Sequence, residues 1–196
     1  MKTRNFLSVA LFTVTVSVTS FAQKTVMVGG APMYPSKNIV ENAVNSKDHT
    51  TLVAAVKAAG LVETLQSKGP FTVFAPTNAA FDKLPKGTVE TLVKSENLKM
   101  LQTILTYHVV AGKMNATDIA KAIQLGNGKA MLKTVSGGTL TAWMEGSVLY
   151  LSDENGAKSK VTIANVNQSN GVIHVIDTVV LPKQYPLVFF IVSCLV

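Results

Sequence analysis

The chain has 196 residues, and 18 lysines and arginines against 11 aspartates and glutamates give it a formal net charge of +7. Arg4 is the sole arginine, and the lysines are scattered rather than interleaved with aromatic residues, which argues against recognition of nucleic acid. Cys194 is the sole cysteine, so no disulfide can form within the chain, and core burial has to hold the fold together. The length suits one domain better than two.

Residues 1–22 have the pattern of a signal peptide. Lys2 and Arg4 form a positive start, an apolar run of 13 residues follows from Phe6 to Val18, and Ser20 and Ala22 occupy the −3 and −1 positions of a cleavage site. A transmembrane anchor is the alternative, but a membrane-spanning helix needs about 20 apolar residues. We therefore expect export to the periplasm, the cell surface or the extracellular space.

Residues 23–35 are expected to form a linker, and residues 36–183 one domain. Apolar residues recur at helical spacing after Ser36, a candidate N-cap, and again from Leu52 to Ala59, ahead of Gly60. A short helical turn is predicted over 61–65, and the run Phe71–Ala75 is predicted to be a strand that Pro76 closes. Thr77 and Asn78 then offer caps for a further helix.

The second half of the domain changes from helical to alternating patterns. Helices are predicted over 95–105 and 117–125, with a strand at Tyr107–Val110 between them. Strands are then predicted over 130–133, 139–144, 147–151, 160–165 and 171–181, separated by glycine-containing turns. Helices mostly N-terminal and strands mostly C-terminal indicate an α+β fold rather than a regular βαβ alternation.

The C-terminal residues 184–196 are almost entirely apolar from Pro186 onward. This tail is too short to span a bilayer as a helix. Packing on the domain and contact with a membrane surface through 187–196 both remain open.

Two segments combine a buried-strand pattern with turn chemistry. The first runs from Thr72 to Phe81, where Phe74 fills a core, Pro76 ends the strand, Thr77 and Asn78 start a helix, and Phe81 returns to the core. The second runs from Asn170 to Pro182. Asn170–Gly171 is predicted to be a tight turn because both residues tolerate positive φ, with His174 and Asp177 on opposite faces of the strand that follows. Burial and turns account for most of these residues.

These segments resemble the two signatures of the fasciclin (FAS1) domain, and Tyr107–His108 lies between them where that family carries a Tyr-His pair. The resemblance covers roughly residues 36–182. It implies a β-wedge of short strands with several helices packed against it, in an extracytoplasmic adhesion module of bacterial secreted type, without catalysis or cofactor. In animal members adhesion is linked to the Tyr-His region and to an Asp-Ile pair before the second signature, where this chain reads Asn165–Val166.

The partner-binding candidates are therefore Tyr107, His108, Asn165 and Val166, and the partner is expected to be an extracellular protein, polysaccharide or lipid bound by a monomer. The alternative is a small-molecule, lipid or polysaccharide binder that uses a groove near Tyr107–His108. Burial separates the two, since an enclosed and hydrogen-bonded pair could not line an open groove. His49, His108 and His174 lack the spacing of metal ligands, and His108 is expected to donate to a carbonyl and to accept from an amide. No nucleophile motif is found.

Overall fold

The computed structural model describes residues 25–185. The predicted signal peptide and residues 186–196 of the apolar tail lie outside these residues. None of the helices within residues 25–185 has both the length and the apolar character of a membrane span.

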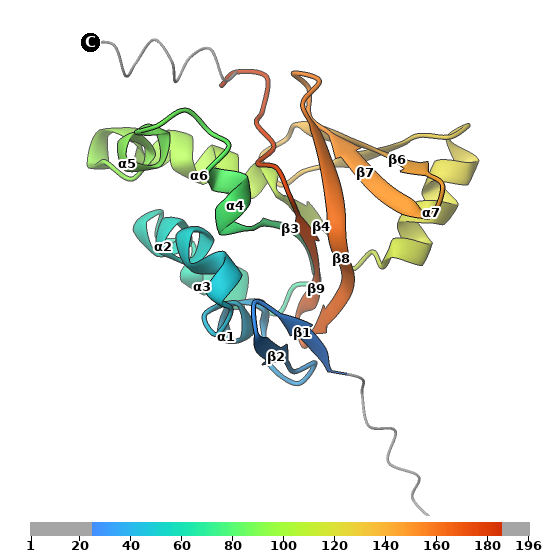
Figure 1. Cartoon of the computed structure of the whole chain (residues 1–196), viewed down its shortest axis with the longest axis horizontal. Helices are drawn as coiled ribbons and strands as arrows, with labels where there is room; N and C mark the ends of the chain where they lie inside the picture. The colour runs from blue at the N-terminus through green and yellow to red at the C-terminus, as the bar shows by residue number, and fades with distance from the viewer. Residues whose placement is uncertain (1–24, 186–196) are drawn as a thin grey trace, which may run out of the picture.

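Seven α-helices and nine strands form the described domain, and the α+β prediction is confirmed (Figure 1). The helices are α1 (Ile39–Ala43), α2 (Thr50–Ala58), α3 (Val62–Gln66), α4 (Asn78–Phe81), α5 (Thr88–Leu92), α6 (Leu98–Tyr107) and α7 (Ala116–Leu125). The strands are β1 (Val26–Val28), β2 (Ala31–Met33), β3 (Phe71–Pro76), β4 (Val109–Ala111), β5 (Ala130–Lys133), β6 (Thr139–Glu145), β7 (Val148–Ser152), β8 (Lys158–Gln168) and β9 (Gly171–Ile176).

Seven of the strands form one bent sheet in the order β4-β3-β9-β8-β7-β6-β5. All neighbours are antiparallel except β3 and β9, which run parallel. The two outer strands meet again at one point, because Val110 and Thr134 form a bridge and the amide of Val135 donates to the carbonyl of Val109 at 2.8 Å. The sheet thus bends back on itself and encloses a wedge-shaped core.

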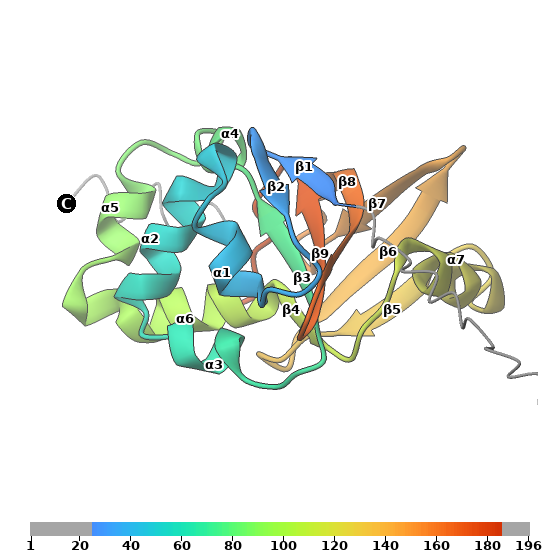
Figure 2. The same cartoon turned by 90° about the horizontal axis from the view of Figure 1, so that it is seen from below.

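Six of the seven α-helices lie together, and α7 lies apart from them. Helices α1 to α6 lie on one side of β3 and β9, whereas α7 lies at the other end of the molecule beside β5 and β6 (Figures 1 and 2). Ile119 and Ile123 of α7 pack into the inside of the wedge against Leu140 and Leu151. This arrangement leaves the outer face of β5 to β8 without a covering helix among the described residues.

The N-terminal hairpin corrects the prediction of a linker over 23–35. Strands β1 and β2 pair antiparallel, and Val28 and Met33 are almost completely buried against Ile39 and Val166. The alternation that buries them was too short to detect, since each strand has three residues. From Val26 onward this segment is part of the domain.

Smaller corrections concern ends of elements. Helix α1 is capped by Asn38, whose side chain and that of Glu41 form a capping box, so Ser36 is not the cap. Tyr107 is the last residue of α6 rather than part of a strand. Strand β9 ends at Ile176 rather than at Leu181, and beyond it the amides of Thr178, Val180 and Leu181 donate to the side chains of Ser159, His108 and Asp153. Helix α5 was not predicted.

Candidate functional site

Tyr107 closes the wedge where the two outer strands meet. Its side chain is fully buried, and its hydroxyl donates to the carbonyl of Thr139 at 2.7 Å and accepts from the amide of Glu154 at 3.3 Å. The ring lies so close to Gly138 that a Cβ there would stand 2.5 Å from a ring carbon. Burial raises the pKa of the phenol well above its usual value, so the hydroxyl stays protonated and its two hydrogen bonds persist.

His108 donates to a carbonyl and accepts from an amide, as predicted, and the amide belongs to the segment after β9, which was not predicted. Nδ1 lies 2.8 Å from the carbonyl of Ile104 and must donate to it, while Nε2 accepts from the amide of Val180 at 3.3 Å. These bonds define one neutral tautomer. Burial lowers the pKa of His108 to about 4, against a partial opposing effect of the Ile104 carbonyl.

One side of His108 borders a small apolar cavity of about 70 Å³ between the helices and β3. The walls are otherwise apolar apart from two threonines, and they include Leu52, Val56, Phe71 and Leu105. An engineered apolar cavity of about 150 Å³ is known to admit benzene. The space beside His108 is less than half that size.

Asn165 and Val166 lie where β8 is irregular opposite β9. Asn165 adopts a left-handed backbone with φ of 60°, and its Oδ1 accepts from the amide of Ala116 at 2.7 Å, at the start of α7. Val166 is 1 % exposed and packs against the hairpin. Of the four partner-binding candidates, Asn165 alone keeps part of its surface accessible, and the other three are closed off from a docking partner.

The residues of the first signature connect elements of the core. The buried Thr72 hydroxyl donates to the carbonyl of Gly112 and accepts from the amide of Met114, and Phe74 stacks on His174 with ring centroids 5.6 Å apart. Thr77 caps α4, as predicted, by accepting from the amide of Ala80 at 3.3 Å.

Asn78 has a different role from the one predicted. It is the first residue of α4, and its side chain accepts from the amide of Thr51 and donates to the carbonyl of Lys47, which ties α4 to the start of α2. Pro76 ends β3, and Phe81 packs among the helices. Each of these signature residues therefore bonds or packs within the fold.

The second signature begins with a turn whose chemistry differs from the prediction. Ser169 and Asn170 connect β8 to β9, but neither Asn170 nor Gly171 has a positive φ. The Asn170 side chain instead accepts from the amide of Ile39 and donates to the carbonyls of Leu65 and Ser67. Glycine is required at 171 because a Cβ would stand 2.1 Å from the carbonyl oxygen of Phe71.

The remaining residues of the second signature are also bonded internally. His174 is fully buried, and its Nε2 donates to the carbonyl of Met114 at 2.9 Å. Asp177 accepts from the amide of Lys160 at 2.9 Å and pairs with Lys83 at 3.6 Å. Burial acts to raise the pKa of Asp177, but these bonds and the Thr178 hydroxyl outweigh it and lower the pKa. Pro182 is buried, and its carbonyl accepts from Asn155.

The outer face of β6, β7 and β8 carries the feature that sequence reasoning missed. The ring of Trp143 stacks on that of Tyr150, with centroids 5.7 Å apart and planes 18° apart, and the Lys158 ammonium lies 5.6 Å from the centre of the Trp143 ring. Trp143 is the only tryptophan in the sequence, and it alternates with the buried Leu140 and Ala142. An aromatic residue on the polar side of an alternating strand is the signal that could have identified this face.

Among residues 25–185, no three histidine, cysteine, aspartate or glutamate side chains gather as metal ligands. The three histidines lie in separate parts of the fold and each bonds to the protein.

Comparisons with known proteins agree with this geometry. A family model described as the Fasciclin domain matches residues 47–182. Protein sll1483 of Synechocystis sp. is 44 % identical over 172 residues, which cover 88 % of each chain. The cell surface glycolipoprotein MPB83 of Mycobacterium bovis is 34 % identical over 145 residues, covering 71 % of this chain and 58 % of the relative.

The fold has a counterpart among solved structures. A FAS1 domain pair from the insect cell adhesion molecule Fasciclin I superposes with a TM-score of 0.67 at 19 % identity, covering 76 % of this chain and 52 % of that one. The family match spans both signatures and the Tyr107–His108 pair between them. The chain therefore belongs to the fasciclin family.

Proposed function

We propose that this protein is an exported interaction module, which binds a partner at the cell surface or outside the cell and does not catalyse a reaction. The observation that carries the proposal is family membership, since a similar bacterial protein is named as a cell surface glycolipoprotein and the structural counterpart is a domain pair from a cell adhesion molecule. The signal-peptide pattern of residues 1–22 supports export.

The structure bears on which surface makes the contact. Tyr107, His108 and Val166 are each at most 3 % exposed, so a partner could reach them only if the fold opened. Asn165 and Val166 also replace the Asp-Ile pair linked to adhesion in animal members. We therefore place the partner contact on an exposed face and assign the four residues to maintaining the fold.

The alternative of a small-molecule site near Tyr107–His108 has weaker support. The cavity beside His108 has a volume of about 70 Å³, and both ring nitrogens of His108 are occupied by backbone groups. A sugar ring or a lipid chain would need a larger space. Binding through an exposed face does not require the cavity beside His108 to become larger.

The proposal is tested by the binding of the purified, fluorescently labelled protein to intact cells and cell envelopes of the producing organism. We expect saturable binding that excess unlabelled protein competes away. A strain that lacks the gene should show altered attachment or aggregation, which the wild-type gene restores. Absence of saturable binding, together with unchanged attachment in that strain, contradicts an interaction function.

A further inference from the structure

We propose that the outer face of β5 to β8 is a binding site for an anionic polysaccharide, with Trp143 as the platform for a sugar ring and Lys129 and Lys158 as the partners of its carboxylates. The inference rests on the proposed function and names the class of partner. Three observations support the inference: the rows of side chains on this face, the hollows along them and the exposed lysines.

The side chains of this face stand in two regular rows. Strand register places Trp143 beside Tyr150 and Tyr150 beside Lys160 in one row. The neighbouring row runs across four strands, from Met131 through Thr141 and Ser152 to Lys158. Because residues two apart on a strand face the same way, both rows point out of the wedge, away from the side that α7 fills.

Two hollows lie along the row that runs from Met131 to Lys158. One hollow of about 260 Å³ is bordered by Lys129, Thr141, Trp143, Ser152, Gly156 and Lys158. A second, of about 570 Å³, is bordered by Ala122, Gly126, Lys129, Ala130, Met131 and Thr141. The two adjoin at Lys129 and Thr141, and the second leads from the outer face to the edge of the sheet, where α7 ends beside β5. This groove of two adjoining hollows, with an aromatic ring and hydroxyl groups along it, matches a chain of sugar units better than a compact ligand.

The chemistry of the groove selects a charged sugar. One face of a pyranose ring presents C–H groups that pack on the flat face of an indole, while its hydroxyl groups can bond with those of Thr141 and Ser152. Lys129, Lys158 and Lys160 are exposed, and none of them pairs with a carboxylate of the described chain. The acidic group beside Trp143 is Glu145, which accepts from the indole Nε1 at 3.0 Å. Positive charge therefore predominates, and it favours uronic-acid carboxylates.

Lys158 connects the two parts of the site. In the structure its ammonium covers the Trp143 ring at 5.6 Å, where a cation and a π-system attract each other by only about 0.5–1 kcal/mol at an exposed position. A sugar ring that stacks on Trp143 displaces this ammonium, which can then pair with the carboxylate of the same sugar. When the sugar ring replaces the Lys158 ammonium on Trp143, the ring gains its stacking contact and the ammonium gains a carboxylate partner.

A membrane surface fits this face less well. Leu125 and Met131 are 87 % and 78 % exposed near the far end of the groove. Trp143 and Tyr150, however, are partly buried and stacked against each other, so they do not protrude as membrane-inserting residues do. A bilayer would also leave the groove unfilled.

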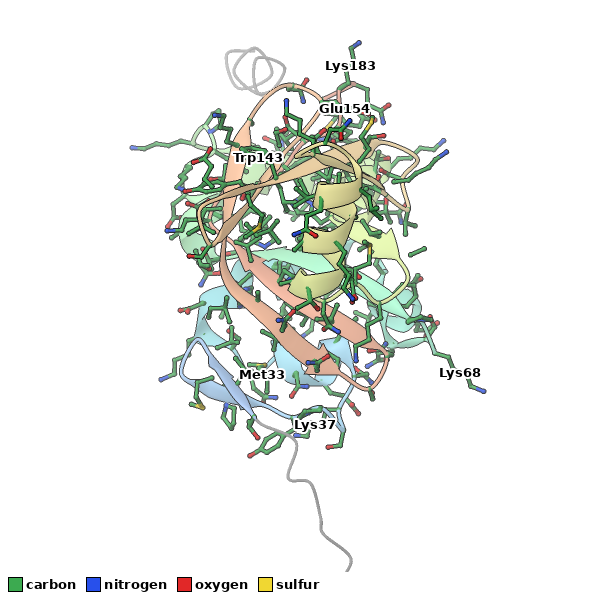
Figure 3. The ribbon with its side chains drawn as sticks, turned by 90° about the vertical axis from the view of Figure 1, so that its right-hand side faces the viewer. Met33, Lys37, Lys68, Trp143, Glu154 and Lys183 are labelled. Carbon is green, nitrogen blue, oxygen red and sulfur yellow. The ribbon has the colours of Figure 1, made fainter. Side chains whose placement is uncertain are left out.

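The chain carries a matched control for this site. Lys37 lies 5.2 Å from the centre of the Tyr34 ring, in a second cation–π pair that borders neither hollow. Figure 3 shows Lys37 and Trp143 near opposite ends of the molecule. Substitutions in the Tyr34–Lys37 pair therefore remove the same kinds of group without touching the groove.

The test measures binding of the purified protein to polygalacturonate by calorimetry, with dextran, polyphosphate and anionic phospholipid vesicles as separate probes. We expect polygalacturonate to bind, and Trp143→Ala to weaken it about tenfold or more, as loss of a central aromatic contact does. Lys129→Gln with Lys158→Gln should weaken binding at least about fivefold in about 50 mM NaCl, and less in about 300 mM, because salt screens exposed charges. Tyr34→Ala and Lys37→Gln should change it less than about twofold.

If Trp143→Ala does not fold, Trp143→Phe and the lysine variants still test the site. Thermal unfolding of each variant shows whether it is folded. Retained affinity in the Trp143→Ala protein, or equal binding of dextran or polyphosphate, overturns the inference. Binding to vesicles but not to polygalacturonate identifies a lipid surface instead. If the protein binds cell envelopes but not polygalacturonate, the polysaccharide inference fails while the proposed function stands; if it binds neither, both fail.

Discussion

The three histidines of the domain are buried as rings that favour the neutral state. Burial is the largest effect on each and lowers the pKa of His49, His108 and His174 below the usual 6.5. His108 and His174 also donate to backbone carbonyls, which partly opposes the effect of burial. His108 and His174 join segments distant in sequence, so they act as structural links whose protonation the fold resists.

The neutral histidines make stability depend on pH. Between pH 6.5 and about 4 the unfolded chain takes up a proton at position 108 and the folded chain does not, so the free energy of unfolding falls as the pH falls. One ring held neutral over this range contributes on the order of 3 kcal/mol to the loss. We expect His108→Gln to be less stable at pH 7 and to lose less stability between pH 7 and 4.5. Urea unfolding at several pH values checks this, and identical slopes for both proteins would count against it.

Asn170 makes three hydrogen bonds to the backbones of α1, of α3 and of the residues after α3. We expect Asn170→Ala to lower the free energy of unfolding by about 2–4 kcal/mol, because the backbone groups that it served lose their partners. Asn167→Ala is the control, since Asn167 donates to the carbonyl of Asn165 on the same strand and is partly exposed. Its cost should stay below about 1 kcal/mol. Equal losses in urea unfolding, followed by Trp143 fluorescence, would show that Asn170 is no such link.

At the scale of elements, the strands with a long alternating pattern were predicted from the sequence. The short strands, and the strand end whose hydrogen bonds involve distant residues, were not. The predicted strands over 130–133, 139–144 and 147–151 match β5, β6 and β7 closely because their alternation runs over four or more residues. The hairpin of β1 and β2 was missed because three residues per strand give too little pattern. The end of β9 could not be predicted, since the amides that follow it bond to the side chains of Ser159, His108 and Asp153, which are distant in sequence.

The same division applies to the candidate site. The hydrogen-bond pattern of His108 was predicted because a histidine between a helix end and a strand has both a carbonyl and an amide within reach. The burial of Tyr107 and Val166 was not, because it depends on how the sheet bends back on itself. The pairing of Trp143 with Tyr150 requires the register of β6 and β7, which one sequence does not reveal.

The hairpin gives a direct test at this scale, because it carries two methionines in different surroundings. Met33 is 2 % exposed and Met27 is 58 % exposed. We expect Met33→Ala to lower the free energy of unfolding by about 2–4 kcal/mol, as truncation of a buried side chain does. Met27→Ala should change it by no more than about 0.5 kcal/mol. If both changes are neutral in chemical denaturation, the hairpin does not pack on the domain.

At the scale of the whole molecule, the signatures and the proposed binding face lie on different parts of the fold. The signature residues connect the helices, β3 and β9 on the inside, whereas Trp143, Tyr150 and Lys158 lie on the outer face of strands β6, β7 and β8. Motifs that identify the family can thus maintain the scaffold while the exposed face determines the partner. Relatives with the same signatures but different residues on β5 to β8 are then expected to bind different partners.

The separation of scaffold and binding face is tested most directly by the binding of labelled protein to cell envelopes, expressed per folded molecule, for one signature variant and one face variant. His108→Gln disturbs the scaffold, and Trp143→Ala together with Lys158→Gln changes the outer face. We expect His108→Gln to bind like the wild type once its folded fraction is taken into account, and the face variant to lose most of its binding. Loss of binding in folded His108→Gln protein, with normal binding by the face variant, would contradict this separation.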